Sequence, residues 1–222
     1  MMSRTLIRLM SVAMLAAIVL AAGTVSAAKQ VTITATRKLN YQGAKGDAMV
    51  EGNVRIEYGS TIINAEKVLF NSDTKTAKVD GGVRIAQDNI VITADKMDAD
   101  FKNDKVKVSG NVKLELTETL TEMDEAGKPK KDVVVLLTSS MEIDINTNDF
   151  KATGGVTITK NKQKVQAGEA AYVDAEKKMT LITGVMIETE DGDTVKSEKA
   201  VVYTDKEAFE AEGEKIEINF TV

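Results

Sequence analysis

Apolar and polar residues alternate with a period of two along most of the chain. Val54 and Ile56 alternate with polar neighbours, and the same pattern runs through 97–101 and 141–145. A period of two is typical of strands that have one buried face and one face in water. Runs of turn-forming residues separate these stretches at 58–60, 87–89, 102–104 and 190–193. The pattern therefore predicts an all-β chain.

A glycine followed by an alternating apolar pair recurs along the sequence. The series begins at Gly52, Gly81, Gly110, Gly154, Gly184 and Gly213, with spacings of 29, 29, 44, 30 and 29 residues. A second marker, a small residue followed by an acid and a lysine, lies 13 residues after its glycine at Ala65, Ala94 and Ser197. A unit of about 29 residues cannot bury its own apolar face, so neighbouring units must stack. We expect one elongated antiparallel domain, with glycines at bends or bulges where strands cross between two sheets.

The single long spacing in this series is explained by an insertion at 117–132. It is rich in charged residues and holds the only proline of the chain, Pro129. We predict a polar, mobile surface loop, for which a tolerated insertion is favoured over a regulatory role.

The first 27 residues have the pattern of a signal peptide. Arg4 and Arg8 precede an apolar stretch, Leu9 to Ala22, and Val25-Ser26-Ala27 gives a small-x-small cleavage site. The alternative is an uncleaved anchor, for which the stretch is short against a span of about 20 residues. We predict export of the chain, cleavage after Ala27 and a single domain over 28–222.

Charge and composition exclude several classes of function. Loss of the two signal arginines would lower the net charge from −5 to −7, which argues against nucleic-acid binding. The chain has no cysteine and no histidine, so the usual nucleophile–base pairs and most zinc sites are absent. The paired acids Asp98 and Asp100 fit a solvated strand face better than glycoside hydrolysis. We therefore expect no catalytic residue, no metal site and no cofactor.

The sequence at both ends of the domain alternates like a strand, and neither end has a feature that would prevent pairing with another strand. At one end lie Val31 and Ile33, and at the other Ile216, Ile218 and Phe220. Open edges of this kind invite pairing with another chain. We predict head-to-tail association through these two edges, the alternative being ordinary edge strands.

The glycine-headed repeats with their small-acid-lysine marker, behind a signal peptide, resemble the LptA/OstA family of periplasmic lipopolysaccharide-export proteins over roughly Val31 to Phe220. Relatives include LptC, which keeps a membrane anchor, and the N-terminal domain of LptD. The cleavage site favours an LptA-like protein over an LptC-like one. The resemblance implies a half-open OstA-like β-jellyroll that carries lipopolysaccharide from the inner to the outer membrane, with lipid A acyl chains between its sheets. It also implies end-to-end stacking with itself or with related β-jellyroll domains of the inner- and outer-membrane export complexes.

On this resemblance the inward-facing apolar residues would form the lipid-binding groove: Val54, Ile56, Phe70, Val83, Ile85, Met97, Phe101, Val112, Leu114, Val156 and Ile158. Alternation alone favours a closed core over a groove, and the resemblance makes the groove an equal alternative. Burying about a dozen methylenes at ~0.8 kcal/mol each would outweigh the repulsion between an acidic protein and a phosphorylated lipid. The alternative function is a structural or adhesive β-solenoid scaffold of the cell envelope that transports no lipid, and binding of lipopolysaccharide distinguishes the two.

Overall fold

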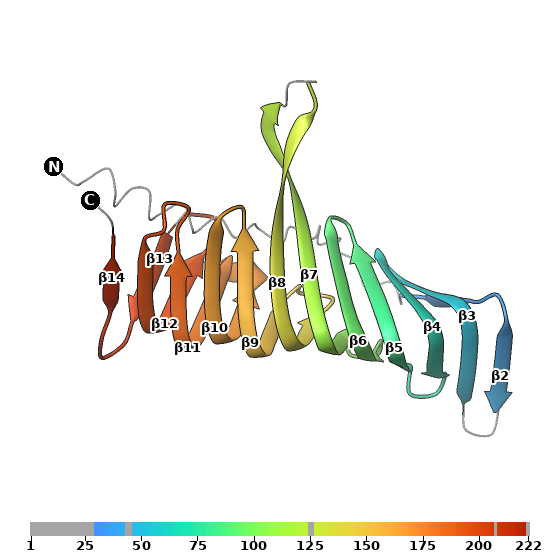
Figure 1. Ribbon diagram of the computed structural model, residues 1–222. Coiled ribbons are helices and arrows are strands. Elements are labelled where there is room, and N and C mark those ends of the chain that lie inside the picture. Colours follow the sequence, from blue (N-terminus) through green and yellow to red (C-terminus); the bar gives the residue numbers. More distant parts are fainter. Residues whose placement is uncertain (1–28, 43–45, 124–126, 207, 221–222) are drawn as a thin grey trace.

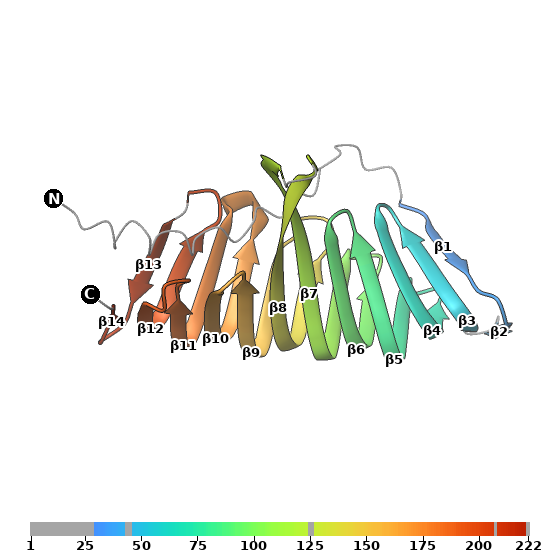
Figure 2. The same cartoon turned by 45° about the horizontal axis from the view of Figure 1, so that its top comes forward.

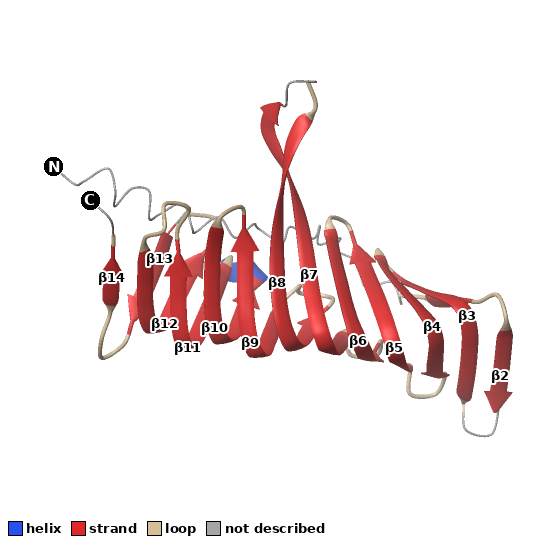
Figure 3. Cartoon of the chain, in the orientation of Figure 1, coloured by secondary structure: helices blue, strands red, loops and turns tan. Residues whose placement is uncertain are grey.

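The computed structural model describes residues 29–42, 46–123, 127–206 and 208–220, and most of them lie in antiparallel β-strands (Figure 1). The strands are β1 (Val31–Thr34), β2 (Lys38–Gln42), β3 (Asp47–Tyr58), β4 (Thr61–Asn71), β5 (Thr76–Gln87), β6 (Ile90–Asp100), β7 (Lys105–Met123), β8 (Pro129–Asp144), β9 (Phe150–Lys160), β10 (Gln163–Val173), β11 (Lys178–Glu188), β12 (Thr194–Tyr203), β13 (Ala208–Glu212) and β14 (Glu217–Asn219). A short 3₁₀ turn, Asp174–Glu176, links β10 to β11. Figure 3 shows that strands make up most of the described chain.

From β3 onward each strand pairs with the next along the chain up to β13, and the described strands form one open 14-stranded sheet. The two ends of the sheet have the same arrangement, in which two short strands pair with different halves of one long strand. Strands β1 and β2 pair with different halves of β3, and β14 and β13 pair with different halves of β12. The predicted antiparallel all-β architecture is confirmed. The two sheets expected from the sequence are, however, two halves of one continuous sheet.

This sheet folds over itself along a line through the middle of its long strands. At that line β3, β5, β7, β9 and β11 each carry two consecutive residues with positive φ, such as Gly81 (113°) with Gly82 (100°) and Gly110 (75°) with Asn111 (46°). Glycine adopts this conformation without strain, and asparagine tolerates it better than most residues. Figure 2 shows the two resulting layers. We call layer A the strand halves continuous with β2 and β13, and layer B those continuous with β1 and β14.

The 13-residue spacing between the two sequence markers follows from this bend. Val54 pairs with Ala65, whereas Glu51 pairs with Lys67, so one extra residue is accommodated between them. The same shift separates Val83–Ala94 from the next pair of β5 and β6. The glycine marker and the small-acid-lysine marker are thus the two sides of one β-bulge. Each repeat is one bent hairpin.

The described parts of the insertion at 117–132 form the paired ends of strands β7 and β8, which corrects the prediction of a polar loop. Thr117, Glu118 and Thr119 pair with Val133, Asp132 and Lys131, so β7 and β8 continue beyond the other strands and project from layer B (Figure 1). Glu118 and Asp132 face each other, and like charges opposite one another destabilise a sheet. The nearly buried ammonium of Lys160 lies 2.7 Å from the Glu118 carboxylate and 3.7 Å from that of Asp132, which neutralises the pair. The ion pairs with Lys160 of β9 explain why this charged segment can form paired strands.

Candidate functional site

The predicted groove residues face the interior, as the alternation indicates. Ten of the eleven are at most 7% exposed, and Phe70 is half-buried against them. They belong to one apolar cluster that runs along the sheet between its layers. The sequence therefore predicts the correct face of each strand, and along most of the sheet this face is packed rather than open.

An apolar pocket interrupts this packing near the middle of the sheet. Its volume is about 50 Å³. Layer A contributes Val106, Met141, Ile143, Ile145, Asn148 and Phe150, and layer B contributes Thr61, Ile85, Gln87, Ile90, Ile92 and Leu114. Ile85 and Leu114 are the two predicted groove residues among them. The pocket thus lies between the two layers, and residues of both layers form its wall.

The polar side chains in this lining are uncharged. Thr61 donates its hydroxyl to the side-chain oxygen of Gln87 at 2.9 Å, and both lie where strands end at the edge of layer B. Asn148 lies opposite, in the turn between β8 and β9 of layer A. Uncharged amide and hydroxyl groups beside an aliphatic wall suit a hydrocarbon chain with a neutral polar linkage.

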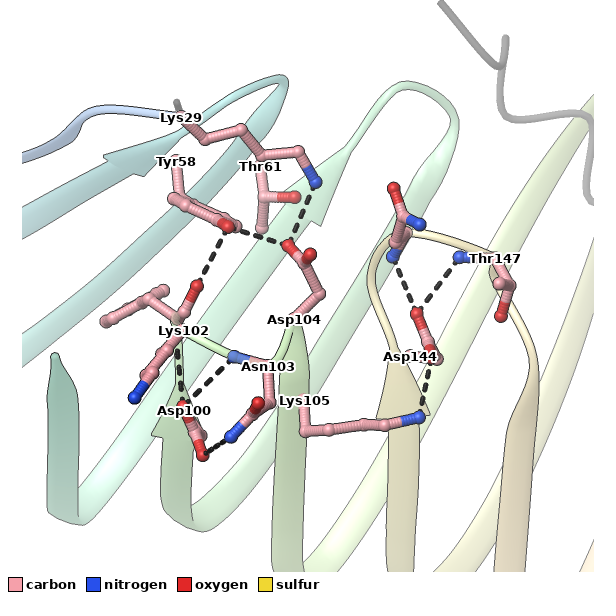
Figure 4. Close-up of polar contacts among 12 residues, drawn as sticks. Lys29, Tyr58, Thr61, Asp100, Lys102, Asn103, Asp104, Lys105, Asp144 and Thr147 are labelled. Atoms are coloured by element: carbon pink, nitrogen blue, oxygen red, sulfur yellow. Dashed lines mark hydrogen bonds and ion pairs between the residues drawn. The ribbon is translucent and has the colours of Figure 1, made fainter. Parts of the chain in front are cut away.

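The open side of the folded sheet, which we call the seam, is where the strand ends of the two layers meet. Beside the pocket the seam is bridged by Tyr58, at the end of β3 in layer B, and by the β6–β7 turn of layer A (Figure 4). The single proton of the Tyr58 hydroxyl is shared between two acceptors, Asp104 Oδ1 at 2.6 Å and the Phe101 carbonyl oxygen at 3.0 Å. The two aromatic rings lie 5.1 Å apart.

Lys29 adds a cation to this bridge. Its ammonium lies 2.9 Å from Asp104 Oδ1 and 5.2 Å above the Tyr58 ring. Burial, together with the hydrogen bond to Asp104 and the negative charge of that carboxylate, raises the pKa of the Tyr58 hydroxyl well above its ordinary value. The hydroxyl therefore remains a donor at all physiological pH values. We call Lys29, Tyr58, Phe101 and Asp104 the latch.

The β8–β9 turn that carries Ile145 and Asn148 is held by Asp144. Its carboxylate accepts hydrogen bonds from the backbone N–H groups of Asn146 and Thr147 and from the Lys105 ammonium. Burial alone would raise the pKa of Asp144, but these three hydrogen bonds outweigh burial and hold the pKa below its ordinary value. Figure 4 shows that this turn lies beside the latch.

The depressed pKa of Asp144 makes a pH-dependent contribution to stability. A carboxyl whose pKa is lower in the folded state stabilises the fold above its unfolded pKa of about 4, and this contribution is lost as the pH falls through the folded pKa. We expect Asp144→Asn to lower the free energy of unfolding by about 1–2 kcal/mol at pH 7, the cost of hydrogen bonds to a charged group. Urea unfolding at pH 7 and pH 3 checks this, because the difference between variant and parent should shrink at pH 3. An equal difference at both pH values would contradict it.

Both terminal edges expose apolar side chains. Ile216, Ile218 and Phe220 are 45%, 55% and 58% exposed, whereas Val31 and Ile33 are half-buried against the core. Sequence reasoning missed β2, in which Leu39 is 67% and Tyr41 56% exposed. These two pair with Val50 and Ala48, which are buried in the interior, so they face inward but lie uncovered. Alternation over 38–42 is a signal that could have found them.

Most of the pocket wall was also missed. Met141, Ile143 and Ile145 alternate with acids and were identified as a strand but not as part of a site. The sequence predicts Phe101 as a groove residue and 102–104 as a turn, but not their contact with Tyr58, which comes from a separate repeat.

Comparison with known proteins assigns the family. The model of the family described as "LptA/(LptD N-terminal domain) LPS transport protein" matches residues 69–208, more than half of the chain. The model described as "Lipopolysaccharide-assembly, LptC-related" matches residues 16–118. The chain therefore belongs to the LptA/LptD N-terminal domain family of lipopolysaccharide transport proteins, and the resemblance inferred from the repeats is confirmed.

One similar solved structure is that of LptH from Pseudomonas aeruginosa, described as the LptA homologous periplasmic component of the conserved lipopolysaccharide transport device. It is 14% identical, the match covers 87% of this chain and 96% of that one, and the TM-score is 0.28. No curated protein matches the chain. Among the described residues, no helix is long and apolar enough to cross a membrane.

Proposed function

We propose that this protein is a periplasmic bridge that carries lipopolysaccharide from the inner to the outer membrane, with acyl chains held between its two layers. The observation that carries this proposal is the aliphatic pocket between layers A and B, with its uncharged polar edge. Membership of a lipopolysaccharide transport family supports lipopolysaccharide as the cargo. In this proposal the signal peptide is cleaved after Ala27, which lies outside the described residues, and the domain is 28–222.

The physical balance supports acyl chains as the part of the lipid that is bound. The chain is acidic, with a net charge of −5, so a phosphorylated head group gains little from general electrostatic attraction. Each methylene taken out of water contributes about 0.8 kcal/mol. Charged side chains on the outer faces pair with one another instead, as Lys78 does with Asp98 and Lys107 with Glu142. The partners are lipopolysaccharide itself and the related β-jellyroll domains at each membrane.

Site-specific photocrosslinking tests the proposal. A photoreactive residue at Ile143, in the pocket wall, is expected to form an adduct with lipopolysaccharide, because an acyl chain in the pocket lies against this side chain. The matched control is Glu142, whose side chain points out of the same strand and pairs with Lys107. Adducts detected with an anti-lipopolysaccharide antibody at Ile143 and not at Glu142 would support the proposal. Equal labelling at both positions, or none at Ile143, would contradict it.

A further inference from the structure

The pocket in this structure is too small for a whole acyl chain. A cavity needs about 10–15 Å³ by this measure to hold one water molecule, so a pocket of about 50 Å³ holds only a few water-sized groups, fewer than the carbons of a long acyl chain. The surrounding apolar side chains are packed, with Val108, Met141 and Ile158 at most 1% exposed. A lipid with long acyl chains can therefore be accommodated only if the two layers move apart.

The fold itself decides where the layers can separate. Along the bend every long strand continues from one layer into the other, so separation there would require breaking the sheet. At the seam the layers meet through side chains. The turns at the edge of layer A are also bonded to one another within that layer, as Phe101 is through its N–H to the Lys75 carbonyl oxygen and Asp174 through its N–H to the Asp149 carboxylate. Tyr58 and Lys29 instead reach from the layer B side to Asp104 of layer A.

The latch flanks the pocket on both sides of the seam. In layer B, Tyr58 pairs with Thr61, which is part of the pocket wall. In layer A, the Asp104 carbonyl oxygen accepts a hydrogen bond at 2.8 Å from the N–H of Ile145, also part of the wall. The latch is thus joined through the backbone to one wall residue of the pocket in each layer.

We propose that this latch is a lateral gate, and that breaking the bridge from Tyr58 and Lys29 to the β6–β7 turn lets acyl chains enter the pocket sideways through the seam. The inference rests on the proposed function. The bridge is suited to repeated opening because it consists of a few hydrogen bonds and one partly exposed ion pair, which the burial of several methylenes can offset. The buried hydroxyl returns to the same acceptors when the ligand leaves.

A pair of tyrosine substitutions tests the gate. Tyr58→Phe keeps the ring against Phe101 but removes the donor that crosses the seam. Tyr172→Phe is the matched control, because Tyr172 is also buried, also packs against a phenylalanine, and has its hydroxyl 3.1 Å from Asp174 within layer A. The probe is purified lipopolysaccharide with a fluorophore on its core sugar, mixed with the protein in a stopped-flow instrument. We expect Tyr58→Phe to raise the association rate constant at least fivefold and Tyr172→Phe to change it less than twofold. Equal rates for the two variants would overturn the gate.

A covalent clamp provides the opposite perturbation. The chain has no cysteine, so Ser60→Cys and Lys102→Cys create a pair of exposed thiols, one on each side of the seam. Joining them with a reducible bis-maleimide should lower the association rate at least tenfold, and reduction of the linker should restore it. Ser60→Cys with Asp88→Cys is the control, since both lie at turns of layer B. Unchanged binding after clamping would overturn the gate while leaving the proposed function intact. Failure of every form, parent included, to bind the probe would overturn the proposed function itself.

Discussion

Replacing Ile143 by tryptophan is expected to weaken binding of lipopolysaccharide at least tenfold while the sheet remains folded. Ile143 lies on β8 in the layer A wall of the pocket and is half-buried, so a larger side chain can extend into the empty volume. An indole ring there occupies space that the end of an acyl chain would otherwise fill. A tenfold loss corresponds to about 1.4 kcal/mol, which is the burial of about two methylenes at ~0.8 kcal/mol each.

Leu137→Trp is the matched control for this variant. Leu137 lies on the same strand, but its side chain is 46% exposed on the outer face. An indole at this position adds the same bulk without entering the pocket. Equilibrium binding of labelled lipopolysaccharide, with thermal unfolding measured in parallel, should show a loss for Ile143→Trp alone. Equal affinity for the two variants at similar melting temperatures would mean that acyl chains bind elsewhere.

The repeat made most of the fold predictable from the sequence. Alternation identifies the inward residues because side chains in a strand have a period of two. The markers Gly81 and Ala94 mark the position of a β-bulge, which the structure shows as a register shift between β5 and β6. The insertion was assigned wrongly because its charges resemble those of a loop. Their neutralisation by Lys160 depends on a strand 28 residues beyond Asp132, which no local pattern contains.

The site was less predictable than the fold for the same reason. Residues that line the pocket, such as Ile92 and Met141, share the inward alternation of residues that are closed core, so the pattern cannot separate them. Asp104 was identified only as part of a turn. Its contact with Tyr58, 46 residues away, arises from the way the sheet folds over itself. Local periodicity determines which face is apolar, whereas the curvature of the whole sheet determines where that face is left unfilled.

We propose that protomers associate head to tail through their terminal edges, and substitution at either edge is then expected to weaken this association. At one end β2 continues layer A and β1 continues layer B, and at the other end β13 and β14 continue the same two layers. Stacking the C-terminal edge of one protomer on the N-terminal edge of the next would therefore join layer to layer and cover Leu39 and Ile218, which now lie exposed. Leu39→Lys and Ile218→Lys each place a charge at this junction, and each should weaken association at least tenfold, or about 1.4 kcal/mol. Light scattering coupled to size exclusion measures the resulting mass.

Mixing the two variants distinguishes a head-to-tail interface from a symmetric one. In a heterologous contact, each variant keeps one intact edge, so the intact C-terminal edge of Leu39→Lys can join the intact N-terminal edge of Ile218→Lys. The mixture should then form dimers and nothing longer, whereas each variant alone stays monomeric. An isologous contact would behave differently, because each variant would disrupt only the interface that uses its own edge. Ile182→Lys, on the outer face of β11 and 37% exposed, is the control and should assemble like the parent. Oligomers that persist in both edge variants would show that the terminal strands are ordinary edges and would contradict head-to-tail assembly.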